Sequence, residues 1–393
     1  MNLPADDTTD QHDPMNYRMR TFRSMDEIDS GQWDRLQPDA RRPQPFIRHA
    51  FLALLERSGC VGGDTGWLPV HLGLEQDGQL VAAAPLYAKL HSYGEYVFDW
   101  AWAEAYQRHG LAYYPKLLSA VPFTPVPGPR LLALNETAQK ALAQALIDWT
   151  RHQRFSSVHV LFPRPEEARR LVAAGMLIRQ GVQFHWQNAG WRNFEDFLSS
   201  LVQSKRKKIR AERRRVAESG ITLERRSGSL IREQDWAFFH KCYTATYRAH
   251  HSTPYLTDRF FMGLGEGFAD NVLMIIARKG PRPIAASLLL HDGHRLYGRH
   301  WGALEHVPFL HFEACYYQAI EHAIEQGFEA IEGGAQGEHK MARGFAPVPT
   351  VSAHWLAEPA FADAVERFLA REGQAVDGYL DELTDRLPFR TSA

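Results

Sequence analysis

The alternation of apolar and polar positions predicts three consecutive strands late in the chain, over residues 271–278, 283–291 and 294–303. Asp292-Gly293 between the second and third runs is a strong two-residue hairpin signal. Residues 311–326 then place apolar side chains at helical spacing and end at Gly327, and residues 328–332 again have the pattern of a strand. A strand-helix-strand crossover makes the two strands it joins parallel, so the pattern predicts a mixed α/β sheet.

The same order of elements is predicted earlier in the chain. Residues 67–75 and 79–89 pair across a turn at 76–78, and the aromatic-rich run 95–102 is predicted as a third strand. This repeated order predicts an internal duplication of two similar α/β units. Further strands are expected at 17–23, 157–162, 182–187 and 350–356, and further helices at 26–36, 46–57, 138–151, 165–174, 194–220 and 360–383.

The domain organisation follows from these elements. Residues 1–15 are polar without an apolar core, so we expect a flexible leader and neither a signal peptide nor a membrane anchor. We predict a first unit over 16–190, a second unit over 191–357 that contains a basic helix at 194–219, and a C-terminal helical segment over 358–393 that packs back on the sheets. No uninterrupted run approaches the ~20 apolar residues of a spanning helix, so a cytoplasmic protein without a transmembrane segment is expected.

Composition narrows the function classes. The 393 residues are 45% hydrophobic and 23% charged, which is ordinary for a globular protein. A net charge of −1 argues against a surface coated in cations for DNA, although a local basic patch is compatible with it. Three cysteines without motif spacing indicate a reducing compartment, and no ligand spacing supports a metal site. Walker, H-E-x-x-H and G-x-S-x-G motifs are absent from the sequence.

The predicted helix at 194–219 has a strongly basic second part, with eight cations against one acid, Glu212. Such a run is either a solvated face or a clamp for phosphate groups. The phosphate could belong to the diphosphate of a nucleotide-linked cell-wall precursor or to the backbone of an aminoacylated tRNA, and the near-zero net charge favours a small local anion. The candidate substrate-binding residues here are Lys205, Arg206, Lys208 and Arg210.

The loop that follows strand 328–332 has the composition of a site. It contains three glycines within five residues and then an acid, an imidazole, an ammonium and a guanidinium group. Functional loops of such sheets gather at the carboxyl ends of parallel strands, where the first turn of helix 311–326 would also lie. The alternative is a solvated surface loop. The candidates are Trp301, His311, Glu313, Gly333, Gly334, Gln336, Glu338, His339, Lys340 and Arg343.

Four segments carry a resemblance to a known family: S-K-R-K-K-I-R-A-E-R-R-R at 204–215, S-T-P-Y-L at 252–256, H-F-E-A-C-Y-Y-Q at 311–318 and G-G-A-Q-G-E-H-K-M-A-R-G-F at 333–345. They resemble the predicted N-acyltransferases related to the Fem peptidoglycan-bridge aminoacyl transferases. The resemblance implies two tandem GNAT-like acyltransferase units, transfer of an acyl or aminoacyl group to an amine, and a small molecule or peptidoglycan precursor as acceptor. It implies aminoacyl-tRNA or acyl-CoA as donor, with no tightly bound cofactor.

Roles for the loop residues follow from the chemistry of acyl transfer, which needs a neutral amine, a stabilised oxyanion and a proton for the leaving group. Lys340 matches the lysine near the end of the Fem-type pattern, and we expect it to face the carbonyl or phosphate of the donor. Glu313 is a candidate base or amine-orienting group, with His311 or His339 as alternates. Gly333 and Gly334 would let backbone amides approach the substrate, and Trp301, Gln336, Glu338 and Arg343 would contact it.

The donor can be tested against a second pattern. Acetyl-CoA enzymes of the GNAT fold hold the pyrophosphate in a [Q/R]-x-x-G-x-[G/A] loop at a helix N-terminus. The second unit has no such glycine pair, whereas the first unit matches at Gln107, Gly110 and Ala112, shortly before a helix predicted to start near Pro115. An acetyl-CoA-dependent N-acetyltransferase and a non-catalytic recognition module for an anionic precursor therefore remain alternatives.

Overall fold

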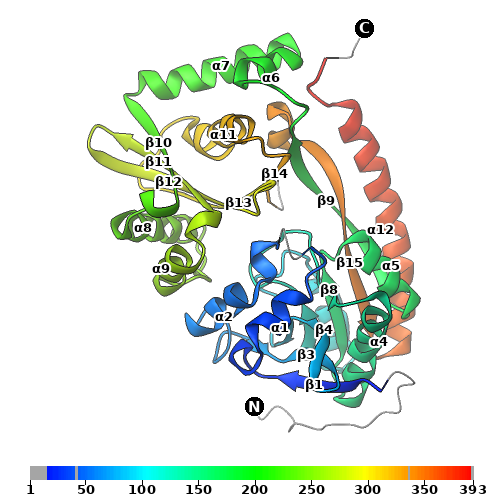
Figure 1. Ribbon diagram of the computed structural model, residues 1–393. Coiled ribbons are helices and arrows are strands. Elements are labelled where there is room, and N and C mark those ends of the chain that lie inside the picture. The colour runs from blue at the N-terminus through cyan, green and yellow to red at the C-terminus, as the bar shows by residue number, and fades with distance from the viewer. Residues whose placement is uncertain (1–15, 40–42, 335–336, 391–393) are drawn as a thin grey trace. The chain divides into compact units, whose positions relative to one another are not determined.

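The computed structural model describes residues 16–39, 43–334 and 337–390, and these form two compact units (Figure 1). Unit 1 contains the chain up to Gly181 together with Thr350–Asp377, and unit 2 contains Val182–Pro349 and the chain from Gly378 onward. The first passage between units therefore lies earlier than the predicted boundary after residue 190. The strand predicted at 350–356 belongs to unit 1. The predicted leader, residues 1–15, lies outside the described residues.

Unit 1 contains two groups of hydrogen-bonded strands, in the orders β1-β3-β4-β7 and β15-β8-β6-β5-β2. The predicted pairing across 76–78 is confirmed: β3 and β4 are antiparallel, and the turn residues Asp77 and Gly78 have the positive φ values that a tight hairpin requires. The elements of unit 1 are β1 (Arg18–Phe22), α1 (Ser30–Arg35), α2 (His49–Arg57), β2 (Trp67–Pro69), β3 (His71–Gln76), β4 (Gln79–Ala84), β5 (Leu86–Lys89), α3 (Trp100–Arg108), β6 (Lys116–Ser119), β7 (Leu132–Ala133), α4 (Glu136–His152), β8 (Ser157–Leu161), α5 (Pro165–Ala173), the start of β9 (Leu177–Gln187), most of β15 (Ala346–Leu356) and the first part of α12 (Pro359–Asp385).

The strand predicted at 95–102 is wrong. Helix α3 begins at Trp100, and the preceding segment forms a loop. Two acids of this loop, Glu95 and Asp99, are buried and bind the ammonium group of Lys116 on β6. Because β5 pairs directly with β6, no position remains between them for a further strand. The aromatic third strand on which the predicted duplication rested is thus absent from the described part of unit 1.

The strands of unit 2 are hydrogen-bonded in the order β10-β11-β12-β13-β14-β9. The predicted parallel pairing is confirmed, with Arg295 of β13 opposite Ala330 of β14 and Tyr297 opposite Glu332. Helix α11 covers one face of this sheet, and α8 and α9 lie on the other (Figure 1). The elements of unit 2 are the end of β9, α6 (Phe194–Ser200), α7 (Gln203–Glu218), β10 (Ile221–Ser227), α8 (Glu233–Ala249), α9 (Asp258–Gly267), β11 (Val272–Lys279), β12 (Arg282–His291), β13 (Arg295–Ala303), α10 (Leu310–Phe312), α11 (Gln318–Gln326), β14 (Ala330–Glu332), the start of β15 and the last turns of α12.

The crossover helix of unit 2 is interrupted near its start. A π-helical turn, Glu313–Tyr317, separates the short α10 from α11, and Gly327 ends α11 in the left-handed conformation, as predicted. Such π-turns are uncommon and often occur at functional sites. Here the turn contains two tyrosines, Tyr316 and Tyr317, that are both buried.

The single basic helix predicted at 194–219 is wrong in one respect, because it consists of two helices. Leu201 is extended and forms a β-bridge with Phe389, and the Val202 amide donates to the carbonyl of Pro388. The C-terminal segment therefore competes for the backbone groups that would have continued α6. On α7 the buried positions are Ile209, Glu212 and Val216, so Glu212 faces inward while the other acid of the helix, Glu218, is exposed.

Among the described residues, no helix combines the length and the apolar character needed to cross a membrane.

Candidate active site

The loop that follows β14 is shaped by its glycines. A Cβ atom on Gly333 would lie 3.1 Å from Lys340 Cδ and 3.1 Å from the Phe184 carbonyl oxygen, so only glycine fits without displacement. The loop then forms a 3₁₀ turn over Glu338–Arg343, which Gly344 ends with a positive φ. This geometry places the Lys340 side chain beside the carboxyl end of β14.

Lys340 is buried with 3% of its surface exposed, and no acidic group of the described residues pairs with it. Its ammonium group donates to the Gly334 carbonyl oxygen at 3.2 Å. Burial lowers the pKa of Lys340 to about 8. The result is a cation that is mostly charged at neutral pH and has donor capacity left for an incoming oxygen.

Aromatic and imidazole rings surround the exposed His339. Tyr316 Oη lies 3.1 Å from His339 Nε2, and the ring centroid of His311 lies 6.2 Å from that of His339. His311 also contacts Trp301, at 5.5 Å between centroids, and Tyr316. Burial, together with the charges of His339, Arg343 and Lys340, lowers the pKa of His311 to about 4, and burial also lowers the pKa of His339. Both imidazoles are therefore neutral at pH 7 and able to accept a proton.

Arg343 has internal partners. Its Nη2 donates to both Glu212 carboxylate oxygens, at 2.9 and 3.1 Å, and its Nη1 donates to the His339 carbonyl at 2.7 Å. The guanidinium carbon lies 3.4 Å from the centroid of the Phe312 ring. With 2% of its surface exposed, Arg343 is placed to hold the loop and is not placed to contact substrate.

Glu313 is also separated from the cluster around Lys340. Its carboxylate accepts from Arg213 Nε at 3.2 Å and from Gln318 Nε2 at 2.8 Å, and 3% of the residue is exposed. Residues two apart on a helical segment point in different directions, so Glu313 and His311 do not converge. The structure thus brings Lys340, His339, His311 and Trp301 together but directs Glu313 towards α7.

The remaining predicted substrate-binding residues are spread over α7 and the loop. Arg210 pairs with Glu195, and Arg206 donates to the Ser199 carbonyl at 3.4 Å. Lys205 and Lys208 form no ion pair with any described residue. The exposed Glu338 accepts from Tyr379 Oη at 2.6 Å, so it belongs to a surface network with α12. Gln336 lies outside the described residues.

Comparison with known proteins fixes the family. Residues 24–391 match the FemAB-like family, which is described as peptidoglycan biosynthesis/recognition. The chain belongs to the FemAB-like family. No curated protein matches the sequence significantly.

Several solved structures are similar to this FemAB-like chain. The crystal structure of FemX shares 12% identity with a TM-score of 0.52, covering 86% of the chain and 98% of FemX. A tandem GNAT protein from the clavulanic acid biosynthesis pathway shares 10% identity with a TM-score of 0.45 over 88% and 99% of the two chains. L-PGS from Bacillus licheniformis shares 11% identity with a TM-score of 0.47, over 81% and 95%. The predicted fold class, mixed α/β in two tandem GNAT-like units, is confirmed.

In unit 1 of this FemAB-like chain, the helix predicted to follow Gln107, Gly110 and Ala112 is wrong. Gln107 lies in the last turn of α3 and Gly110 follows its C-terminus, where the Gly110 amide donates to the Gln107 carbonyl. Helix C-termini present carbonyl oxygens and a partial negative charge, which repel a pyrophosphate. The helix predicted near Pro115 is strand β6, so the N-terminal amides that such a loop needs are missing at Ala112.

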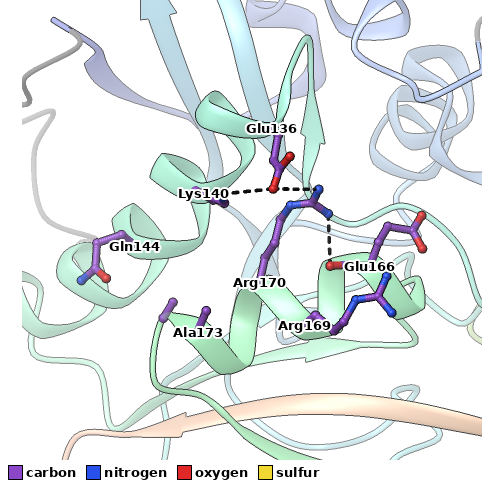
Figure 2. A pocket seen from close by; sticks show the side chains of 8 residues that line it. Glu136, Lys140, Gln144, Glu166, Arg169, Arg170 and Ala173 are labelled. Atoms are coloured by element: carbon purple, nitrogen blue, oxygen red, sulfur yellow. Dashed lines mark hydrogen bonds and ion pairs between the residues drawn. The ribbon is translucent and has the colours of Figure 1, made fainter.

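A surface pocket of unit 1 is lined by none of the predicted site residues (Figure 2). It has a volume of about 530 Å³ and lies between α4 and α5. Glu136 bridges Lys140 at 3.1 Å and Arg170 at 3.7 Å, as the dashed lines in Figure 2 mark. The charged side chains of the pocket therefore largely neutralise one another, and we assign it no function.

Two buried acids near the site, Glu332 and Glu212, are not among the residues predicted from the sequence. Glu332, the last residue of β14, is 6% exposed, and burial raises the pKa of its carboxyl to about 7. Its Oε1 lies 3.5 Å from Arg295 Nη1, whereas Oε2 has no hydrogen-bond partner among the described residues. The second group is Glu212, the one acid in the basic second part of the predicted helix. The sequence contains a signal for each of them. Glu332 directly precedes a Gly-Gly pair, and Glu212 lies at core spacing between Ile209 and Val216.

Proposed function

We propose that this FemAB-like chain transfers an acyl or aminoacyl group to the amine of a peptidoglycan precursor or related small molecule. The carrying observation is Lys340, a buried ammonium group without an acidic partner among the described residues, at the carboxyl end of a parallel strand. Family membership supports an acyl- or aminoacyltransferase in general and a cell-wall precursor as its substrate class.

The proposed reaction forms a bond between the acceptor nitrogen and the acyl carbon, while the bond from that carbon to the donor oxygen or sulfur breaks. Lys340 would stabilise the negative charge on the carbonyl oxygen, since a preorganised donor in a water-poor site is worth about 10²–10³ in rate. With a pKa of about 8, Lys340 would also be able to protonate the leaving atom. His339, which is exposed and neutral, would take the proton lost by the attacking amine.

Aminoacyl-tRNA is the donor that we favour over acyl-CoA. The loop at Gln107 has the wrong helix end for a pyrophosphate, which weakens the case for CoA in unit 1. On α7, Lys205 and Lys208 lie on the solvent side without ion pairs among the described residues, which suits the phosphate backbone of an RNA.

The test is a transfer assay with charged tRNA or acyl-CoA as donor and a nucleotide-linked muropeptide as acceptor, read by product mass. Lys340→Met should lower turnover at least 10²-fold without unfolding the protein. Lys279→Met is the matched control, because Lys279 is an exposed lysine of the same unit, and it should retain full activity. Retained turnover in Lys340→Met would remove Lys340 from the mechanism.

A recognition module is the second candidate, since the family description names recognition beside biosynthesis. Wild-type protein that binds the muropeptide but yields no product with either donor would favour this alternative.

A further inference from the structure

We propose that Glu212 on α7 is a positioning residue, which holds the loop that contains Lys340 and His339 in place through Arg343 and Tyr317. The effect that we expect on catalysis rests on the proposed function. Its geometric basis is a buried three-way contact between α7, the π-helical turn and the 3₁₀ turn.

The carboxylate of Glu212 is fully engaged. One oxygen accepts from Arg343 Nη2 at 3.1 Å, and the other accepts from the same nitrogen at 2.9 Å and from the Tyr317 hydroxyl. Glu212 is 4% exposed and Arg343 is 2% exposed, so water does not screen this pair. A buried charge pair with additional hydrogen bonds is strongly directional and costly to break.

The contact reaches the reacting groups through short links. Arg343 Nη1 donates to the carbonyl of His339, the residue immediately before Lys340. Tyr317 is adjacent to Tyr316, whose hydroxyl contacts the His339 ring. One carboxylate thus restrains both the backbone of the loop and the helical turn that faces it.

The loop needs such a restraint because its own sequence provides little. Gly334, Gly337 and Gly344 all adopt positive φ, and glycine leaves the unfolded and alternative loop conformations accessible. A second ion pair, from Arg213, the next residue of α7, to Glu313, anchors the helix to the π-helical turn. Helix α7 therefore serves as the rigid support against which the loop is held.

The experiment compares Glu212→Gln with Glu218→Gln in the full chain. Glu218 is an exposed acid at the end of the same helix, paired with Arg214 at 3.7 Å, and serves as the matched control. We expect Glu212→Gln to lower kcat 10- to 100-fold with KM for the donor little changed, because displacing a reacting group by about 1 Å costs up to 10²-fold. Hydrogen-deuterium exchange should accelerate in residues 337–345 and stay unchanged in β11–β13.

Three outcomes would overturn the proposal: unchanged kcat, unchanged exchange in 337–345, or an equal rise of exchange throughout unit 2, which indicates general destabilisation. A double-mutant cycle with Tyr317→Phe adds a further check, since residues that share one contact give non-additive losses. The exchange measurement needs no substrate. If wild-type protein transfers nothing, the proposed function fails, while the positioning role of Glu212 is still decided.

Discussion

Unit 1 and unit 2 each bury a lysine at a strand or strand end, and the two lysines differ in their partners. Lys116 on β6 is fully buried and donates to Ser92 at 2.9 Å, to Glu95 at 2.8 Å and to Asp99. All three of its N–H donors are thus satisfied by side chains. Lys340 has one carbonyl oxygen as its partner among the described residues.

The difference decides what each cation is for. Burial alone would lower the pKa of Lys116, but the negative charges of Glu95 and Asp99 outweigh burial and raise it. At Lys340 burial dominates and lowers the pKa. A buried cation that is paired with two carboxylates has its charge neutralised and stabilises the fold. A buried cation without such partners still attracts an anionic ligand.

Replacing Lys116 should produce the largest effect on stability. Lys116→Met leaves Asp99 buried without its lysine and Glu95 with only Lys89, at 3.8 Å, which costs about 3–5 kcal/mol of unfolding free energy. Urea unfolding of the variant and the wild type measures this loss. The control is Lys140→Met, because Lys140 forms an exposed pair with Glu136 that is worth less than about 1 kcal/mol. Equal losses in the two variants would contradict the comparison.

Replacing Lys340 should have the opposite effect on stability and raise the free energy of unfolding. The pKa of Lys340 is lowered from 10.5 to about 8, so the folded protein binds this proton more weakly than the unfolded chain. Below pH 8 both states are protonated and the penalty is fully present, at roughly 3 kcal/mol or less. Between pH 8 and 10.5 the penalty disappears. Lys340→Met should therefore be more stable than the wild type at pH 7, by an amount that shrinks towards pH 10.5.

This prediction is checked by denaturant unfolding of both proteins at pH 7 and pH 10. Taking the difference between the two proteins cancels the titration of all other groups. A Lys340→Met variant that is less stable at pH 7, or a difference that does not change with pH, would show that Lys340 has an anionic partner within the fold.

The same contrast explains which features the sequence predicted. The strands, the crossover helix and the glycine loop at 333–345 depend on local periodicity and local turn residues, and these were predicted. The failures depend on partners far away in sequence. The loop at 95–99 is held by Lys116, and the break at Leu201 depends on Phe389. The pairing of a lysine and the orientation of Glu212 depend on contacts between segments that are far apart in sequence, so local patterns do not predict them.

On the surface of α7 the comparison applies to neighbouring cations. Arg213 pairs with Glu313 and Glu321, whereas Lys205, Lys207 and Lys208 have no ion pairs within the described chain. Replacing these three lysines by alanine should change stability by less than about 0.5 kcal/mol. It should nevertheless weaken tRNA binding and reduce the slope of log affinity against log salt by about 2, since each lost phosphate contact contributes roughly 0.7–0.9.

Arg213→Gln serves as the paired counterpart of the triple-alanine variant. It should lower stability measurably, because Glu313 is buried and loses its cation, and it should leave the salt slope unchanged. Filter binding of tRNA over a salt series, together with urea unfolding of each variant, separates the two effects. If the triple variant kept the full salt slope, the three lysines would be solvated and would not contact phosphate groups. That result would contradict the proposed role of unpaired cations on α7. It would not test the role of Lys340.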